Sequence, residues 1–366
     1  MGSQKIALFM QDLAGGGAER VMLQLANGIA ENGHQVDLVL VRPDGPYLSM
    51  VSSKIRIVDL GTERTVKSIW ALSRYIRRER PVALLSALVH VNVAAILAHL
   101  LSGRVTKLVL SEHNQISKNA AVAESRTIRL AHRLVPYLYP FADEIVAVSQ
   151  GVADDLQRFS GLPSAKIKVI FNPIVTPELS SRANEPVSHP WFEPDQPPVI
   201  LGVGRLNQQK DFPMLIEAFA KVRSKMPVRL IILGEGEGRA ELEKLIETYS
   251  LQEDVDLPGF VDNPFAMMAK AKVFALSSAW EGLPTVLVEA LACGVPVVST
   301  NCPSGPDEIL RGGELGPLVE VGNASGFAEA LTAILQEPPS TQTLQARASD
   351  FTVDRSVNCY QDLLLA

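Results

Sequence analysis

The sequence predicts an α/β protein made of two parallel-sheet domains, and three observations lead to this prediction. The chain has 366 residues, about twice the usual length of one domain. Short apolar runs alternate with helix-length amphipathic segments, which is the pattern of parallel strands covered by helices on both faces. A proline-rich span at residues 175–198 interrupts the alternation near mid-chain, as expected of a linker between two domains.

The first series of elements precedes the proline-rich span. Its expected strands are residues 6–10, 36–41, 82–89, 107–111, 144–149 and 167–171. Helices are expected at residues 18–32, 91–101, 124–139 and 151–159. Residues 82–103 lack Lys, Arg, Asp and Glu and are long enough to cross a bilayer. Their polar residues Ser86, His90, Asn92 and His99 instead favour a buried strand followed by a packed helix.

The second series follows the span. Strands are expected at residues 199–204, 229–233, 254–257, 273–277, 295–300 and 318–321. Helices are expected at residues 212–225, 239–249, 286–292 and 326–335. We therefore expect two Rossmann-like domains that face a central cleft, with ligands bound outside the carboxyl ends of the strands. The expected limits are 1–185 and 186–345, followed by a helix in 346–366 that packs near or onto the first domain.

Composition limits the class and the compartment of the protein. With 47% hydrophobic and 20% charged residues, a disordered scaffold or a disulfide-stapled small protein is excluded. Residues 1–190 carry 21 Lys and Arg against 16 Asp and Glu, whereas residues 191–366 carry 13 against 24. Cys293, Cys302 and Cys359 fit neither a disulfide framework nor a zinc pattern, so we interpret them as buried thiols in a reducing cytosol. The apolar run after Met1 is too short for a signal peptide.

A glycine-rich turn follows the first expected strand. Gly15, Gly16 and Gly17 open the helix that comes next, where backbone amides and the helix N-terminus favour an anion. The alternative is a tight turn that only packs a helix against a strand. Because the G-x-G-x-x-G spacing is absent and no acidic residue ends the next strand, a nicotinamide dehydrogenase is disfavoured.

Charged residues follow two strands of the second series. Arg205 and Lys210 lie after the strand at 199–204 and could neutralise a diphosphate, or could be surface salt-bridge residues. Glu281 lies in a loop after the strand at 273–277, and Glu289 lies eight residues further on, an expected two turns down the next helix. Both carboxylates could accept hydrogen bonds from ligand hydroxyls. Otherwise Glu289 pairs with a lysine and Glu281 lies in solvent.

Four segments carry a resemblance to a known family. The turn GGGAER at 15–20, GRLNQQKD at 204–211, LPGFVDN at 257–263 and EGLPTVLVE at 281–289 resemble family 4 retaining glycosyltransferases of the GT-B fold. SEHN at 111–114, FNPI at 171–174 and NCPSGPDEIL at 301–310 are similar to the branch that builds bacterial surface polysaccharides and lipid-linked oligosaccharides. The last of these segments departs from the family pattern at Asp307.

The resemblance implies a role for each matching residue. Arg205 and Lys210 would hold the donor diphosphate, Glu281 the hydroxyls of the transferred sugar, and Glu289 the ribose. His113 would close the site over the donor sugar, and with Glu281 it forms the expected catalytic pair. The other donor-binding residues implied are Gly16, Gly17, Gly234, Glu235, Phe260, Val261, Gly282, Leu283, Pro284, Thr285 and Val286, with Phe260 and Val261 beside the base.

The expected reaction transfers a sugar from a nucleotide-diphosphate donor, with UDP as the expected nucleotide, and keeps the anomeric configuration. No metal and no other cofactor is expected. The triplet Asp254-Val255-Asp256, which is used for metal binding in transferases of another fold, lies at the start of a strand and is interpreted as chance. Alternatives are a glycosidase, a sugar-nucleotide epimerase or hydrolase on the same plan, a transferase with a soluble small-molecule acceptor, and a non-catalytic binding module.

The acceptor side is expected in the first domain. Arg126, Arg129 and Arg133 share one face of the helix expected at 124–139, with apolar residues opposite. A second basic segment at 66–80 contains Arg74, Arg77 and Arg78 beside Trp70 and Tyr75. These clusters could hold the domain on an anionic membrane surface, or they could form an ordinary solvated charged face. The resemblance implies the first, with a polyprenyl-diphosphate-linked glycan as acceptor and the inner face of the cytoplasmic membrane as location. Nucleic-acid binding is disfavoured, because no recognised module accompanies the cations.

Overall fold

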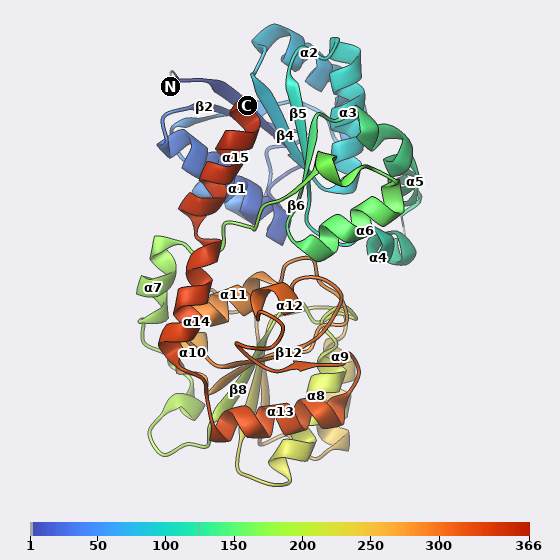
Figure 1. Cartoon of the computed structure of the whole chain (residues 1–366). Coiled ribbons are helices and arrows are strands. Elements are labelled where there is room, and N and C mark those ends of the chain that lie inside the picture. Colours follow the sequence, from blue (N-terminus) through green and yellow to red (C-terminus); the bar gives the residue numbers. More distant parts are fainter. Residues whose placement is uncertain (1–2, 124) are drawn as a thin grey trace. The chain divides into compact units, whose positions relative to one another are not determined.

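The structure, a computed structural model, describes residues 3–123 and 125–366, and each of its two compact units is an α/β domain (Figure 1). The N-terminal unit runs up to Pro173 and also contains Val353–Ala366, and the C-terminal unit is Ile174–Thr352. The C-terminal unit thus begins before the predicted boundary at residue 185 and ends after the predicted boundary at residue 345.

The N-terminal unit has a parallel sheet of strand order β3-β2-β1-β4-β5-β6-β7. The strands are β1 (Lys5–Met10), β2 (Gln35–Leu40), β3 (Ile55–Asp59), β4 (Ala83–Ala87), β5 (Lys107–Glu112), β6 (Glu144–Ala147) and β7 (Ile167–Val169). Strand β3 was not predicted, because this edge strand is short and carries Arg56 among its apolar residues. The strand order reverses between β1 and β4, the position at which open α/β sheets bind ligands.

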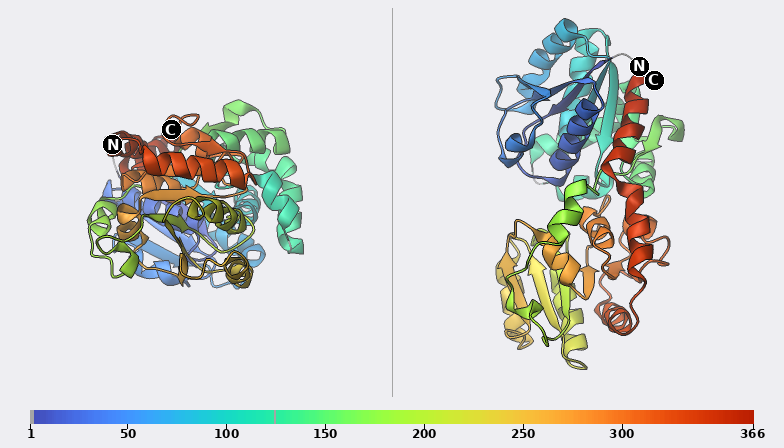
Figure 2. Two further views of the ribbon diagram at one scale, coloured as in Figure 1. Left: turned by 90° about the horizontal axis from the view of Figure 1, so that it is seen from below. Right: turned by 90° about the vertical axis from the view of Figure 1, so that its left-hand side faces the viewer.

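Helices cover both faces of this sheet. They are α1 (Gly17–Glu31), α2 (Ile69–Glu79), α3 (Val89–Ser102), α4 (Ile116–Val122), α5 (Arg126–Leu138), α6 (Gln150–Ser160) and α15 (Val353–Leu365). Side chains of α1 and α15 share one core with Ile6 and Leu8, and side chains of α2, α3 and α5 share the other with Ala7 and Phe9. The last helix of the chain therefore packs onto the N-terminal unit, as predicted (Figure 2).

The C-terminal unit has a second parallel sheet, of order β10-β9-β8-β11-β12-β13. The strands are β8 (Val199–Val203), β9 (Arg229–Leu233), β10 (Val255–Gly259), β11 (Val273–Leu276), β12 (Val297–Thr300) and β13 (Leu318–Val319). The helices are α7 (Pro177–Ala183), α8 (Phe212–Arg223), α9 (Arg239–Thr248), α10 (Pro264–Lys270), α11 (Thr285–Ala292), α12 (Pro306–Ile309), α13 (Ala324–Gln336) and α14 (Thr341–Ala348). The strand order reverses between β8 and β11.

The proline-rich span is not the free linker that its composition predicted. Pro177 and Pro190 begin short helices, and the first of these, α7, packs against α10 and α11. Arg182 donates a hydrogen bond to the carbonyl of Asp262 at 2.6 Å, and the Arg229 guanidinium lies 4.6 Å from the centre of the Trp191 ring. The span therefore belongs to the C-terminal unit, which explains the earlier division.

The uncharged stretch at residues 82–103 forms strand β4 and helix α3, as predicted, and both are mostly buried. Within the described residues, no helix combines the length and the apolar character that a bilayer crossing requires. Of the three cysteines, Cys302 is buried and Cys293 half-buried, whereas Cys359 on α15 is exposed. The prediction of a buried thiol was therefore wrong for Cys359, because it lies on the outer side of its helix.

Candidate active site

The predicted donor-binding residues of the C-terminal unit converge at one edge of its sheet. Four neighbouring parallel strands end at this edge, and each is followed by predicted site residues. Phe260 and Val261 follow β10, Gly234 and Glu235 follow β9, the segment with Arg205 and Lys210 follows β8, and the segment from Glu281 to Val286 follows β11. The edge includes the point between β8 and β11 at which the strand order reverses, where a ligand site is expected.

A buried ion pair joins the loops after β8 and β11. Lys210 Nζ lies 2.6 Å from Glu281 Oε1, and their side chains are 16% and 7% exposed. Ser278 Oγ also donates to Glu281 Oε1, at 2.7 Å, and Gln209 Nε2 lies 3.5 Å from Oε2. Glu281 is therefore buried and paired, in contrast to the alternative in which it lies in solvent. A charge in this setting is held in one place and can meet a ligand without reorganisation.

Two residues that sequence reasoning missed hold these loops together. Ser277 Oγ donates to the carbonyl of Lys210 at 2.7 Å, and Gln209 Nε2 donates to the carbonyl of Trp280 at 3.0 Å. The backbone N–H of Ala279 donates to the carbonyl of Gln209 at 2.8 Å. Gln209 adjoins Lys210 in sequence and Ser277 lies four residues before Glu281, but no local pattern distinguishes them from ordinary polar loop residues.

Arg205 differs from Lys210 in being exposed. Among the described residues, no side chain forms an ion pair or hydrogen bond with its guanidinium. Arg205 is therefore available to an anion at this edge of the sheet, and its five N–H donors match phosphate oxygens.

The loop after β9 is built against the loop after β8. Gly234 has φ +134°, and a Cβ at this position would lie 2.0 Å from the carbonyl oxygen of Gly204, so only glycine fits. The N–H of Leu206 donates to the carbonyl of Glu235 at 2.9 Å. This hydrogen bond fixes the backbone of Glu235 at the edge of the sheet. The Glu235 carboxylate is instead held by Arg239, at 2.9 Å.

Helix α11 begins directly after the loop that contains Glu281. Its first residues, Thr285 and Val286, are partly exposed, and backbone N–H groups in the first turn of a helix have no intrahelical acceptor. Ahead of them, Gly282, Leu283 and Pro284 are buried. Ser304 Oγ, from the loop after β12, donates to the carbonyl of Gly282 at 2.7 Å. The arrangement presents a fixed helix N-terminus, which favours anions.

Glu289 lies four residues after Thr285, on the same face of α11. The prediction placed it two turns down the helix, but α11 begins at Thr285, so it lies about one turn from the N-terminus. Its side chain is buried. The carboxylate is therefore closer to the helix N-terminus than the sequence indicated.

Phe260 is the most exposed of the large apolar side chains in the described residues, at 79%. It directly follows β10, and Val261 beside it is half-buried. An aromatic ring left in water at the ligand edge of a sheet costs hydrophobic free energy and is suited to stacking on a planar ligand.

The two carboxylates of the Asp-Val-Asp triplet each form an ion pair within the C-terminal unit. Asp254 pairs with Arg223 at 2.8 Å, and Asp256 with His189 at 2.9 Å, both at the start of β10 and away from its carboxyl end. In the described parts of the chain, no group of three or more His, Cys, Asp or Glu side chains has an arrangement suited to a metal ion.

The glycine turn lies at the carboxyl end of β1 in the N-terminal unit. Gly15 has φ +100°, and a Cβ at Gly16 would lie 2.2 Å from Glu19 Oε2, whereas Gly17 faces open space. The Glu19 carboxylate thus lies against the start of α1, in the region where the turn was predicted to receive a phosphate. A carboxylate in the first turn of a helix is itself favourable.

His113 directly follows β5 and is 9% exposed. Burial lowers the pKa of its imidazole to about 4, so the ring is neutral at physiological pH. Its Nε2 lies 3.1 Å from Ser111 Oγ, which in turn lies 3.0 Å from the Tyr360 hydroxyl on α15. These two partners were not predicted.

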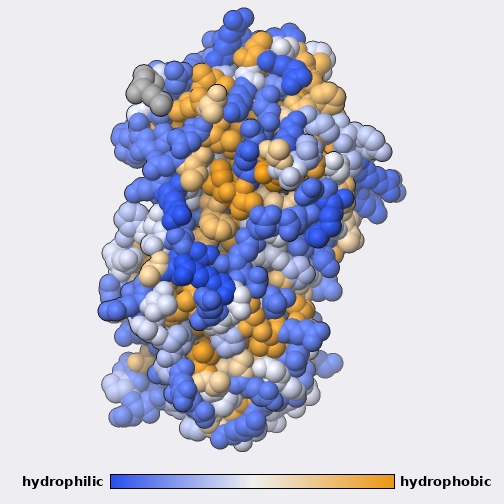
Figure 3. Space-filling view, in the orientation of Figure 1, coloured by the Kyte–Doolittle hydropathy of each residue, from blue (hydrophilic) through white to orange (hydrophobic). Residues whose placement is uncertain are grey.

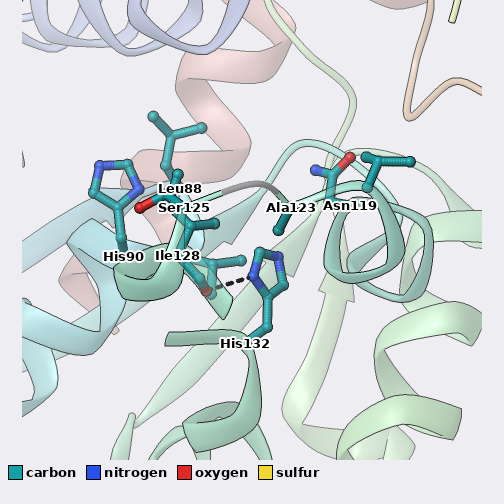
Figure 4. Close-up of a pocket in the computed structure, with 9 residues that line it drawn as sticks. Leu88, His90, Asn119, Ala123, Ser125, Ile128 and His132 are labelled. Carbon is teal, nitrogen blue, oxygen red and sulfur yellow. Dashed lines mark hydrogen bonds between the residues drawn. The ribbon is translucent and has the colours of Figure 1, made fainter. Parts of the chain in front are cut away.

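A pocket of about 730 Å³ opens in the N-terminal unit after the end of β4 (Figure 4). Its walls combine apolar and polar side chains, namely Leu88, Val89, His90, Asn119, Val122, Ala123, Ser125, Ile128 and His132. Leu88 has φ +75°, an unusual conformation for a leucine. His132 Nδ1 bonds to the Ile128 carbonyl at 2.8 Å, whereas its buried Nε2 has no partner in the described residues.

The basic helix predicted at 124–139 is α5, although its first residue, Glu124, lies outside the described residues. Arg126, Arg129 and Arg133 are exposed, as the prediction requires. Most of the opposite, apolar face packs in the core with α3 and is not free for a membrane: Ala131 and Val135 are buried, and Leu134 and Leu138 are partly buried. Ile128 on the same face is exposed. In the view of Figure 3, the surface of the N-terminal unit is a mixture of hydrophilic and hydrophobic residues.

The second basic segment forms α2, on the other side of α3 from α5. Arg74, Arg77 and Arg78 are exposed. Trp70 beside them is 72% exposed, but Tyr75 is buried and donates to Asp37 at 2.6 Å. Of the two aromatic residues predicted to accompany these cations, only Trp70 is therefore at the surface.

Comparison with family models gives one match in each half of the chain. Residues 15–177 match the model "Glycosyltransferase Family 4", and residues 185–351 match "Glycosyl transferases group 1". These two segments cover nearly all of both units.

Similar proteins match along nearly the whole chain. The N-acetylgalactosamine-N,N'-diacetylbacillosaminyl-diphospho-undecaprenol 4-alpha-N-acetylgalactosaminyltransferase of Campylobacter jejuni is 30% identical, covering 91% of each chain. The lipopolysaccharide core biosynthesis glycosyltransferase LpsE of Rhizobium meliloti is 28% identical, covering 92% of this chain and 91% of LpsE. Among solved structures, Anabaena Alr3699/HepE in complex with UDP and glucose matches with a TM-score of 0.79 at 21% identity, covering 99% of each chain.

Proposed function

The chain belongs to glycosyltransferase family 4 and has the GT-B fold of two Rossmann-like domains, and we propose that it transfers a sugar from a nucleotide-diphosphate donor to a glycan acceptor. The proposed donor is a UDP-sugar, and the proposed acceptor is a hydroxyl of a polyprenyl-diphosphate-linked glycan in cell-surface polysaccharide or glycoconjugate synthesis. The UDP in the Anabaena complex and the diphospho-undecaprenol in the name of the Campylobacter relative support these classes.

The observation that carries the proposal is the group of charges at the β8/β11 switch point. Exposed Arg205 and paired Lys210 provide two cations for a diphosphate, and Glu281 provides an acceptor for sugar hydroxyls. The N-terminus of α11 adds backbone donors for phosphate oxygens. We assign Glu289 to the ribose, Gly234 and Glu235 to the border of the nucleotide, and Phe260 with Val261 to the base.

The proposed reaction retains the anomeric configuration and needs no metal. The bond between the anomeric carbon and the donor phosphate oxygen breaks, and a bond to the acceptor oxygen forms on the same face of the sugar. The proton of the acceptor hydroxyl passes to the departing phosphate oxygen. Arg205 and Lys210 neutralise the charge that develops on the diphosphate as it leaves, while Glu281 and His113 orient the sugar.

We assign the acceptor to the N-terminal unit. The pocket after β4 offers apolar walls with a few polar groups, which is typical of small-molecule sites, and α5 with its exposed arginines forms one of its walls. Arg74, Arg77 and Arg78 on α2 add further positive charge. We propose that these cations hold the protein peripherally on the inner face of the cytoplasmic membrane.

A donor panel tests the proposed function. The full chain is incubated with UDP-, GDP- and dTDP-sugars, with and without a bacterial membrane extract, and nucleotide release and labelled lipid-linked product are measured. We expect release with one donor class, dependent on the extract, and a loss of activity in Arg205→Ala. Release of nucleotide without any acceptor would favour a hydrolase, conversion of the donor sugar an epimerase, and no turnover of any donor would contradict transferase activity.

A further inference from the structure

A hydrogen-bonded chain connects the last helix of the protein to His113. Tyr360 on α15 lies 3.0 Å from Ser111 Oγ through its hydroxyl, and Ser111 Oγ lies 3.1 Å from His113 Nε2. Tyr360 and Ser111 are fully buried. All three residues belong to the N-terminal unit, because α15 packs against α1 and β4.

The direction of these hydrogen bonds follows from counting donors and acceptors. Burial raises the pKa of the Tyr360 hydroxyl, so the hydroxyl keeps its proton. Within the described part of the chain, the hydrogen-bond partner of this hydroxyl is Ser111 Oγ. A buried hydroxyl proton without an acceptor is costly, so Tyr360 donates to Ser111. The Ser111 proton is then directed to His113 Nε2. A neutral imidazole carries one proton, which must therefore be on Nδ1.

We propose that Tyr360 is a positioning residue that, through Ser111, holds His113 in the tautomer protonated at Nδ1. His113 then presents an N–H group and takes an oxygen acceptor, such as a sugar hydroxyl or a phosphate oxygen. It cannot act as a general base, because its Nε2 lone pair is already occupied by Ser111. The proposed tautomer of His113 does not depend on the proposed function; only the assignment of the accepting oxygen to the donor sugar rests on it.

The Tyr360 ring has a second role that an experiment must keep intact. It lies in the core formed by α1, α15 and the sheet, together with Val357 and Leu364. Tyr360→Phe removes the hydroxyl and retains this packing. Ser111→Ala removes the middle of the hydrogen-bonded chain and gives an independent second variant. Tyr249→Phe, at a partly exposed tyrosine of the C-terminal unit, is the matched control.

Nitrogen-15 NMR of histidine-labelled full-length protein measures the tautomer directly, with the His113 signals assigned by their loss in His113→Gln. We expect His113 of the unsubstituted protein to be protonated at Nδ1 at pH 7. Protonation at Nε2, or equal populations of the two tautomers, would overturn the proposal whether or not the protein transfers sugar.

The variants then test the role of Tyr360. In Tyr360→Phe and Ser111→Ala we expect the population protonated at Nδ1 to fall and kcat to fall about fivefold, the size expected for one hydrogen bond. KM for the acceptor and the values for Tyr249→Phe should not change. An unchanged tautomer and kcat in both variants would mean that Tyr360 only packs. A wild-type protein with the expected tautomer but no transfer would contradict the proposed function alone.

Discussion

Lys210 Nζ lies 2.6 Å from Glu281 Oε1, so a buried ion pair bridges the two loops at the switch point of the C-terminal sheet. The two residues come from loops that follow neighbouring strands, and neither side chain is more than 16% exposed. Because water is largely excluded, each charge depends on the other for stabilisation. The pair that we assign to the donor sugar and its diphosphate therefore also contributes to the fold.

This double role predicts the effect of Lys210→Ala. Among the described residues, the substitution leaves the buried Glu281 carboxylate with Ser278 and Gln209 as its side-chain partners, and we expect the free energy of unfolding to fall by about 3 kcal/mol. Urea unfolding measures this change. Lys221→Ala is the matched control, because Lys221 pairs with Glu217 on the exposed side of α8 at 3.5 Å, where a salt bridge contributes about 0–1 kcal/mol. Equal losses in the two variants would contradict the structural role.

Arg205→Ala should impair binding without affecting stability. Because Arg205 is exposed and we assign it to the diphosphate, we expect affinity for UDP to fall roughly 10- to 100-fold, as for the loss of a charge-assisted hydrogen bond. Affinity for uridine, which has no phosphate, should not change. Isothermal titration with both ligands measures this difference. Lys225→Ala removes one exposed positive charge elsewhere in the same unit and should leave both affinities unchanged; a similar loss there would indicate a general charge effect.

Phe260→Ala should weaken the binding of both UDP and uridine, whereas Arg205→Ala should weaken the binding of UDP alone. If the exposed ring stacks on the base, affinities for UDP and uridine should fall together, by about 1–3 kcal/mol, and the unfolding temperature should stay the same because the ring is 79% exposed. The same titrations measure both affinities. Tyr249→Ala, at another partly exposed aromatic of the unit, is the control. Unchanged affinities in Phe260→Ala would place the base elsewhere.

The sequence predicted the fold where the signal was local. The apolar run at residues 229–233 is strand β9 with the predicted limits, because continuous apolar runs are typical of strands buried on both faces. The proline-rich span was misjudged because prolines also begin short helices. Its packing depends on Arg182 and Asp262, eighty residues apart, and no local pattern contains that contact.

In the candidate site too, residues with a local sequence signal were predicted, and contacts between distant residues were not. Charges and glycines that follow strands, such as Lys210, Glu281 and Gly234, were recognisable from the sequence. The partners that position such residues were not recognisable. For His113 they are Ser111 and Tyr360, which lie 249 positions apart. Amphipathicity predicted α5 correctly, but an amphipathic pattern alone does not say whether the apolar face packs against another helix such as α3 or against a membrane.

Glu112 should make stability depend on pH. Burial raises the pKa of its carboxyl from 4.5 to about 7, against the opposing effect of hydrogen bonds from Tyr139 and Asn92. Between these values the folded protein binds one proton more than the unfolded chain, so the free energy of unfolding falls as pH rises from about 4.5 to 7.

Glu112→Gln removes this titration. Relative to the variant, the unsubstituted protein should lose about 1–3 kcal/mol of stability between pH 5 and pH 8, since one pKa unit corresponds to about 1.4 kcal/mol. Urea unfolding at both pH values measures the difference. Glu337→Gln, at an exposed position, should show no such change, and a parallel pH dependence of Glu112→Gln and the unsubstituted protein would assign the titration to another group.

The exposed arginines of α5 allow a test of membrane association. Most of the apolar face of this helix packs on α3, so binding should depend on charge rather than on deep insertion. Each basic residue near an anionic surface contributes about 1 kcal/mol, and the triple substitution of Arg126, Arg129 and Arg133 by Ala should lower partitioning onto phosphatidylglycerol vesicles by roughly 100-fold. Co-sedimentation measures this, and salt near 1 M should abolish it. The triple Ala variant at the exposed Lys225, Lys244 and Lys270 of the C-terminal unit loses the same charge and should bind normally. Equal losses in the two triple variants would mean that net charge, and not the α5 surface, drives the association.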